Sequence, residues 1–203
     1  MTHTAPSLVL LDLDGVLVAY DHRRRMEHLG AAINCDPDRV YAVLFEAGLE
    51  ARYDAGDIDS DTYLAELGDA LGHPVDIAAW RAARAAAMDC TPATCERIAA
   101  LARRCDIAML TNNGPLVIDA LPQSLTSLFQ PGRIFCSGAL RLAKPSPEVF
   151  RHVVARLGHA PHATLFLDDN PDNVAGARAA GLHAEHVASP GDFDAILARY
   201  ALD

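Results

Sequence analysis

The first hydrophobic feature of the chain is a short apolar run that begins at Ser7, has Asp12 inside it and is broken by Gly15. An unbroken apolar run of about four to eight residues is typical of a strand buried on both faces of a parallel sheet. Because side chains alternate along a strand, Asp12 and Asp14 start on the same face. A simple turn would explain Asp14 before Gly15, but not Asp12 within the run. We therefore predict a buried strand that presents two carboxylates at its end.

Helical periodicity follows over residues 22–88, where no strand pattern interrupts it. Asp36 and Pro37 are typical of the start of a helix, and Gly48 is typical of its end. A wholly helical segment between two buried strands indicates a subdomain inserted into a sheet. The predicted helices cover 36–48, 60–71 and 76–88, and the predicted linkers cover 16–21 and 89–92.

From Pro92 onward, helical and strand patterns alternate, which predicts a parallel sheet with helices on both faces. The fold class is therefore α/β, with a Rossmann-like core formed by 1–15 and 92–203 and an inserted helical cap formed by 16–91. The predicted strands of this second part are 107–110, 133–136, 163–167 and, with a weak pattern, 183–187. The predicted helices are 92–104, a short one after Gly114-Pro115, 146–157, 171–180 and one that starts at Phe193.

Polar residues stand at the carboxyl ends of these strands, where open α/β sheets bind their ligands. Acidic groups from two strand ends suit Mg²⁺, which prefers oxygen ligands and leaves places for phosphate oxygens and water. Threonine, asparagine and lysine side chains, with the amides of a helix start, suit an anion. Without the lysine and a cation, four carboxylates and a phosphate would repel one another strongly. The residues at these ends are Asp12 and Asp14, then Thr111, Asn112 and Asn113, then Lys144, and finally Asp168 and Asp169.

The charge balance restricts the class of partner. The 203 residues carry a formal net charge of −10, whereas nucleic-acid binding needs a basic surface. A local group of Lys, Arg and metal still binds a phosphorylated molecule on an acidic protein. We therefore expect a small phosphorylated metabolite as partner and no nucleic acid, while the oligomeric state stays open.

Cysteine usage and hydropathy predict a cytoplasmic protein. The five cysteines form an odd set without a Cys-x-x-Cys pair, which favours free thiols over disulfides or zinc. No apolar run approaches the length of a membrane span, and residues 1–6 form a short polar tail rather than a signal peptide. We expect no membrane partner.

Four motifs, taken in order, make the chain similar to the haloacid dehalogenase (HAD) superfamily of hydrolases. The helical segment falls where that superfamily places its mobile cap. The resemblance is greatest to phosphatases with a small helical cap that act on sugar phosphates and similar metabolites. The motifs are Asp12-Leu13-Asp14-Gly15-Val16, Thr111, Lys144-Pro145, and Leu167-Asp168-Asp169-Asn170-Pro171-Asp172-Asn173-Val174.

The resemblance implies a two-step phosphoryl transfer that needs Mg²⁺. Asp12 would attack phosphorus to form an aspartyl-phosphate, and Asp14 would protonate the leaving group and later take a proton from water. The implied catalytic residues are Asp12, Asp14 and Lys144, and the implied phosphate ligands are Thr111, Asn112 and Lys144. The implied Mg²⁺ ligands are Asp12, the main-chain carbonyl of Asp14, Asp169, and Asp168 directly or through water, with Asn173 as a partner behind them.

Other functions share this residue set. Dehalogenases of the superfamily attack carbon with the first aspartate and typically lack an acid two residues later, so Asp14 argues against dehalogenation. A phosphomutase shares the core and differs in how the cap excludes water, so it stays an alternative. A protein that binds a phospho-ligand without turnover is a second alternative, although every motif residue that turnover needs is present.

The cap is expected to choose the substrate. Arg23 and Arg24 belong to the most basic run of the chain, 22–25, which is either a solvated helix face, the favoured interpretation, or the source of an arginine for the distal part of the substrate. Tyr20 and Tyr53 are further candidates for substrate contacts. For Trp80, in an alanine-rich helix, core packing is favoured.

Overall fold

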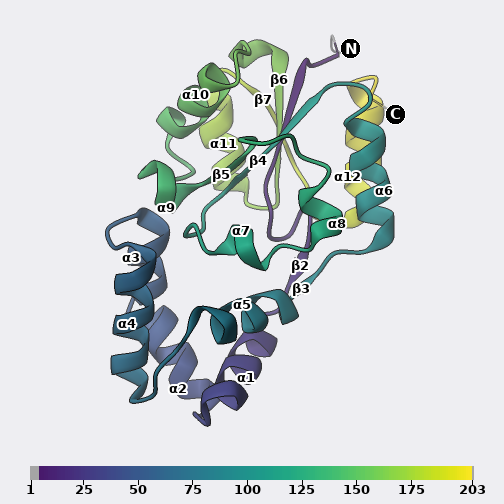
Figure 1. Ribbon diagram of the computed structural model, residues 1–203. Helices are drawn as coiled ribbons and strands as arrows, with labels where there is room; N and C mark the ends of the chain where they lie inside the picture. Colours follow the sequence, from purple (N-terminus) through teal and green to yellow (C-terminus); the bar gives the residue numbers. More distant parts are fainter. Residues whose placement is uncertain (1–4, 203) are drawn as a thin grey trace.

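The computed structural model describes residues 5–202 and contains a five-stranded, wholly parallel sheet with a separate group of helices at one end (Figure 1). Of the predicted N-terminal tail, residues 1–4 lie outside the described part. The order β5-β4-β1-β6-β7 places the first strand in the centre. This arrangement confirms the predicted α/β class. The strands are β1 (Leu8–Leu11), β4 (Asp106–Thr111), β5 (Ile134–Cys136), β6 (Thr164–Asp168) and β7 (His183–His186).

The central strand is apolar at every position because both of its faces are covered. Leu8 and Leu10 pack in a cluster with residues of α10 and α11, whereas Val9 and Leu11 pack in a cluster with residues of α6 and α12. The two pairs of helices lie on opposite sides of the sheet in Figure 1. The helices are α6 (Pro92–Leu101), α10 (Pro147–Arg156), α11 (Pro171–Ala179) and α12 (Pro190–Arg199).

Short helical turns follow two strands of the sheet. The predicted turn after Gly114-Pro115 is α7, but α8 and α9 were not predicted, since four-residue helices are too short to show periodicity. The bounds are α7 (Val117–Ala120), α8 (Gln123–Thr126), α9 (Ser137–Leu140) and the 3₁₀ turn η2 (Pro161–Ala163).

The inserted segment is helical as predicted, and it lies below the sheet in Figure 1. Residues 19–20 and Asp89 were predicted as plain linkers and Met88 as the end of a helix, but they form the paired antiparallel strands β2 (Ala19–Tyr20) and β3 (Met88–Asp89). Two-residue strands carry no sequence pattern and form here because the chain leaves and re-enters the core side by side. The predicted boundaries of the cap, 16–91, stay a prediction. Its elements are α1 (His22–Ile33), α2 (Pro37–Tyr41), the π-helical turn η1 (Ala42–Glu46), α3 (Leu49–Ala55), α4 (Ser60–Leu71) and α5 (Ile77–Ala86).

A buried ion pair lies at the centre of the cap helices. Arg25 Nη1 and Nη2 lie 2.6 and 3.2 Å from the two oxygens of Glu50. Tyr63 donates its hydroxyl to Glu50 and accepts from Trp80 Nε1 at 3.0 Å. Trp80 is buried, as predicted. The favoured interpretation of 22–25 as a solvated face is wrong for Arg25, which is 2% exposed because it neutralises Glu50 inside the cap.

We expect Tyr63→Phe to lower the free energy of unfolding by about 1–3 kcal/mol, because Glu50 and Trp80 each lose a buried hydrogen-bond partner. Urea titration followed by tryptophan fluorescence measures this change, since Trp80 is the only tryptophan. Tyr41, which is 43% exposed, offers the matched control, and Tyr41→Phe should change stability by less than about 0.5 kcal/mol. Equal effects of the two substitutions would show that the buried network contributes nothing.

All five cysteines are free thiols, as predicted, and the Sγ atoms of Cys90 and Cys95 lie 3.5 Å apart. Among the described residues, no helix combines the length and the apolar character that a membrane span requires.

Candidate active site

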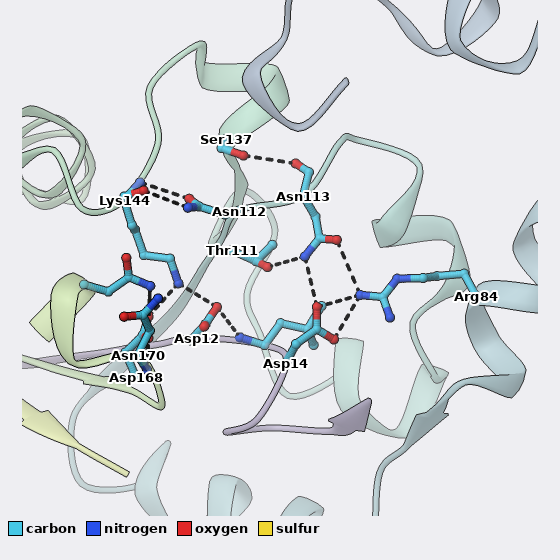
Figure 2. Close-up of polar contacts among 12 residues, drawn as sticks. Asp12, Asp14, Arg84, Thr111, Asn112, Asn113, Ser137, Lys144, Asp168 and Asn170 are labelled. Atoms are coloured by element: carbon cyan, nitrogen blue, oxygen red, sulfur yellow. Dashed lines mark hydrogen bonds and ion pairs between the residues drawn. The ribbon is translucent and has the colours of Figure 1, made fainter. Parts of the chain in front are cut away.

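The candidate site lies at the carboxyl ends of β1, β4 and β6, and its centre is the ammonium group of Lys144 (Figure 2). Asp12 follows β1 directly, and its Oδ1 lies 2.7 Å from Lys144 Nζ. Asp168, the last residue of β6, lies 2.7 Å from the same nitrogen. All three side chains are buried. The two carboxylates and the lysine predicted from separate strand ends therefore form one contact.

Asn112 holds the loop that carries Lys144. Its side-chain amide accepts from the main-chain N of Lys144 at 2.9 Å and donates to the main-chain carbonyl of Lys144 at 2.8 Å. The structure thus gives this side chain a positioning role that was not predicted. A contact between Asn112 and phosphate stays a prediction.

Asp168 is held by several donors besides Lys144. Asn173 Nδ2 lies 3.0 and 3.1 Å from its two oxygens, and the main-chain N of Asn170 donates to Oδ1 at 2.8 Å. Asn170 also caps α11, because its side chain accepts from the main-chain N of Asp172. Asn173 therefore contacts Asp168, and its predicted role as a partner behind the Mg²⁺ ligands stays a prediction.

One group of carboxylates among the described residues has the spacing for a metal ion. Asp12, Asp168 and Asp169 each offer an oxygen within 4.8 Å of the others. Burial raises the pKa of Asp12 to about 7, against the lowering effect of the Lys144 ammonium. Burial, followed by the charge of Asp168, also raises the pKa of Asp169. Three carboxylates against one ammonium leave excess negative charge, and hard oxygen donors of this kind fit Mg²⁺.

Gly15 makes room for this group. A Cβ atom at Gly15 would lie 2.2 Å from Oδ2 of Asp169, and the residue has a φ of +82°. A side chain here would therefore displace Asp169 and strain the backbone. Glycine is required for the site itself, as well as for the turn after β1.

Asp14 turns its carboxylate toward the cap. Arg84 Nη2, from α5, lies 2.9 and 2.7 Å from the two oxygens of Asp14, and Asn113 Nδ2 lies 3.2 Å from one of them. Asn113 also donates to Thr111 Oγ1 at 2.7 Å. The Asp14 side chain is thus outside the group of three carboxylates, and its contribution of a main-chain carbonyl to Mg²⁺ stays a prediction.

Arg84 was missed in the sequence, whereas Asn113 was placed at a strand end without a role of its own. Arg84 is four residues after Trp80 on α5, and both are buried, so they share the inner face of that helix. Trp80 was predicted to lie in the core. Its spacing to Arg84 is therefore the sequence signal that would have identified Arg84 as a buried residue. Asn113 directly follows the predicted pair Thr111 and Asn112, and only the side-chain geometry distinguishes it.

The four cap residues predicted to contact the substrate lie in different environments. Tyr20 lines a cavity beside Asp14, and its ring lies 4.0 Å below the Arg84 guanidinium. Tyr53 is buried, stacks on Tyr63 and accepts from the main-chain N of Leu116, so it joins the cap to the core. Arg23 and Arg24 are exposed and are not among the residues that line this cavity. Substrate contacts of all four side chains stay predictions.

Comparisons with known proteins bear on the family and the fold of the chain. The sequence model of the haloacid dehalogenase-like hydrolases matches residues 6–181. A D-ribitol-5-phosphate phosphatase from Bacteroides thetaiotaomicron is 22% identical over 173 residues, which cover 82% of this chain and 84% of that protein. A HAD family enzyme from the same organism has a TM-score of 0.79 at 19% identity, with 96% of this chain and 99% of that chain covered. Its complex with magnesium and inorganic phosphate has a TM-score of 0.72 at 19% identity, with 89% and 93% covered.

A fold comparison alone does not separate the activities of this group. The L-2-haloacid dehalogenase from Xanthobacter autotrophicus has a TM-score of 0.64 at 23% identity, with 95% of this chain and 82% of that chain covered. The family assignment rests instead on the sequence model, which spans all four motifs and the helical segment between the first two. The chain belongs to the haloacid dehalogenase-like hydrolases.

Proposed function

We propose that the protein is a Mg²⁺-dependent phosphatase that hydrolyses a small phosphomonoester, such as a sugar phosphate, through an aspartyl-phosphate at Asp12. The observation that carries the proposal is the separation of the two aspartates. Asp12 contacts Lys144 in a group of three carboxylates, of which Asp12 and Asp168 are buried and Asp169 is exposed, whereas Asp14 points to the cap, where a leaving group would lie. Two carboxyl groups two residues apart thereby have different neighbours, which suits a nucleophile and an acid.

The residues support two consecutive displacements. The carboxylate of Asp12 attacks phosphorus, the bond to the leaving oxygen breaks, and Asp14 donates a proton to that oxygen. Water then attacks the phosphoryl group on Asp12, gives its proton to Asp14, and inorganic phosphate leaves. Lys144 and Thr111 stabilise the negative oxygens of the transferred group. Bound Mg²⁺ supplies further charge neutralisation for these oxygens.

The expected metal ligands differ in how many hydrogen bonds their carboxylate oxygens already accept. Asp168 already accepts from Lys144, from the main-chain N of Asn170 and from Asn173, whose Nδ2 is shared between both oxygens, so less of its acceptor capacity is free for a direct metal contact. We therefore expect Asp12 and Asp169 to bind Mg²⁺ directly and Asp168 to bind it through water. The magnesium and phosphate complex of the structurally similar HAD family enzyme supports this choice of metal.

The presence of Asp14 favours phosphate ester hydrolysis over dehalogenation, because breaking a carbon–halogen bond needs no proton for the leaving halide. The similarity to a D-ribitol-5-phosphate phosphatase supports the same choice. The two alternatives are a phosphomutase and a binding protein without turnover. A phosphatase releases inorganic phosphate, whereas a mutase returns an isomeric phosphate ester, so the product distinguishes them.

The test is release of inorganic phosphate from p-nitrophenyl phosphate and from a panel of sugar and polyol phosphates. We expect turnover with Mg²⁺, loss of at least about 100-fold with excess EDTA, and recovery when Mg²⁺ is restored, because the three carboxylates need a cation to accept a phosphate group. Absence of phosphate release from the whole panel with Mg²⁺ would overturn the proposal.

Asp169→Asn provides the control for the metal effect. It removes one carboxylate from the group of three and should raise the Mg²⁺ concentration for half-maximal activity by about 10-fold or more. Mg²⁺ should also raise the melting temperature of the wild-type protein more than that of this variant. An unchanged Mg²⁺ dependence would place the ion elsewhere.

A further inference from the structure

The peptide unit between Asn113 and Gly114 follows β4 and lies between the core and the cap. Its carbonyl oxygen accepts from the main-chain N of Gly138, in α9, at 3.2 Å. Its N–H group donates to Oδ1 of Asp54, in α3 of the cap, at 2.7 Å. One side of this peptide is thus held by the core, and the other side is held by a carboxyl group of the cap.

The helix that carries Asp54 packs closely on the core at this point. A Cβ atom at Gly114 would lie 2.0 Å from Cε1 of Tyr53, so only glycine lets α3 approach the chain this far. Tyr53 also accepts from the main-chain N of Leu116 at 3.0 Å, and Ser137 Oγ donates to the main-chain carbonyl of Asp54 at 2.6 Å. The backbone that carries the Asp54 carboxyl group is therefore itself fixed against the core.

The side chain of Asn113 connects this peptide to Asp14, the proposed acid (Figure 2). Its Nδ2 lies 2.7 Å from Thr111 Oγ1 and 3.2 Å from Oδ2 of Asp14, and its Oδ1 lies 3.4 Å from Arg84 Nη2. Arg84 contacts both oxygens of Asp14, at 2.9 and 2.7 Å, whereas Asn113 contacts only one. Asn113 therefore favours one rotation of the Asp14 carboxyl group, which a contact shared by both oxygens does not.

We propose that Asp54 is a positioning residue for proton transfer by Asp14, because it holds the peptide from which the Asn113 side chain orients the Asp14 carboxyl group. The inference rests on the proposed phosphatase function and adds to it a residue that acts through two others. It also predicts a selective defect. An alkoxide leaving group needs a proton as its bond to phosphorus breaks, whereas p-nitrophenolate is stabilised by its own ring. Loss of Asp54 should therefore slow the esters with basic leaving groups most.

The test measures kcat/KM for p-nitrophenyl, phenyl and benzyl phosphate, whose leaving oxygens are increasingly basic. This constant includes phosphoryl transfer to Asp12 and not the later hydrolysis. In Asp54→Ala we expect the ratio of kcat/KM for p-nitrophenyl phosphate to that for benzyl phosphate to rise at least about tenfold, which is part of the roughly 10²–10⁴-fold that a general acid contributes. Phenyl phosphate should lie between them. The ratio does not depend on the folded fraction, and an effect through Thr111 is common to all three esters.

Asp54→Asn separates the hydrogen bond from the presence of a side chain. Burial, followed by the charge of Glu50, raises the pKa of Asp54 to about 8, so its carboxyl group is mostly neutral at pH 7. A neutral carboxyl group and a carboxamide have the same shape, and each offers an oxygen to the N–H of Gly114. We therefore expect Asp54→Asn to keep the ratio within about twofold of the wild-type value. Asp57→Ala is the matched control, since Asp57 is exposed just after α3 and should leave the ratio unchanged.

A double variant tests whether Asp54 acts through Asn113. Asn113→Ala should raise the same ratio, and Asp54→Ala/Asn113→Ala should raise it no further than Asn113→Ala alone, because residues in one chain of contacts are not additive. Additive effects would show that Asp54 acts by another route and would contradict the inference.

The remaining outcomes separate the inference from the function beneath it. An equal loss for all three esters in Asp54→Ala, or no loss, means that Asp54 does not orient Asp14, and the phosphatase stands. A ratio in Asp54→Asn as high as in Asp54→Ala contradicts the role of the hydrogen bond. Wild-type protein that hydrolyses only p-nitrophenyl phosphate shows that Asp14 gives no proton to leaving groups, which overturns the inference. If the wild-type protein releases phosphate from none of the esters, the phosphatase function itself fails.

Discussion

Asp12→Asn is expected to lower kcat/KM for p-nitrophenyl phosphate by at least about 10³-fold, because an amide oxygen is a far weaker nucleophile than a carboxylate. The fold should survive. Oδ1 of the asparagine keeps the acceptor for the main-chain N of Leu13, which lies 2.7 Å away, and Lys144 keeps its contact with Asp168. Phosphate release measures the loss of activity, and a thermal melt of the same preparation measures whether the fold survives.

Asp57→Asn is the matched control for this substitution, since Asp57 is exposed on the cap and lies outside the candidate site. It should leave kcat/KM within about twofold of the wild-type value. Mass spectrometry of the wild-type enzyme quenched in acid during turnover should detect a phosphoryl group that is missing from Asp12→Asn. An Asp12→Asn enzyme with more than a tenth of wild-type activity would show that another group attacks phosphorus.

The core of the site was predictable from the sequence because parallel strands end at one edge of a sheet. Once Asp12, Thr111 and Asp168 are placed at strand ends, the topology brings them together without further information. The contact of Lys144 with two of these strand ends follows from the same geometry, although its distances do not. Local sequence patterns were therefore sufficient for the residues that lie on the sheet.

The polar contacts of the cap were not predictable in the same way. Arg84 and Asp14 are 70 residues apart, and Arg25 and Glu50 are 25 residues apart. Their pairing depends on how the helices of the cap pack on one another and on the core, which hydrophobic periodicity does not specify. The basic run 22–25 shows the consequence, since Arg23 is exposed and Arg25 is buried although both belong to one turn of α1.

The sequence contains a single lysine, Lys144, among sixteen arginines. An ammonium group is compact enough to lie 2.7 Å from both Asp12 and Asp168, whereas a planar guanidinium has a larger, fork-shaped donor set. This difference in shape explains why position 144 is a lysine although the chain has arginine at its other basic positions. It also makes Lys144 the residue whose loss should affect stability and activity together.

We expect Lys144→Met to lower the free energy of unfolding by about 3–5 kcal/mol in EDTA, because two buried carboxylates lose the cation between them. Activity should fall by at least about 100-fold even with Mg²⁺, since the transferred oxygens lose a positive partner. Urea titration in EDTA and phosphate release in Mg²⁺ measure the two effects. Lys144→Arg retains the charge but not the shape, so it should recover more stability than activity.

Removal of one carboxylate tests the cause of this instability. In the double variant Lys144→Met/Asp168→Asn, less negative charge is buried without a cation, and the coupling between the two substitutions should be about 0.5–3 kcal/mol in favour of the double variant. A Lys144→Met protein as stable as the wild type, or strictly additive effects in the double variant, would mean that the carboxylates do not depend on this lysine. Asp168 would then be held by Asn170 and Asn173 alone, and the ammonium would serve the phosphoryl group without stabilising the fold.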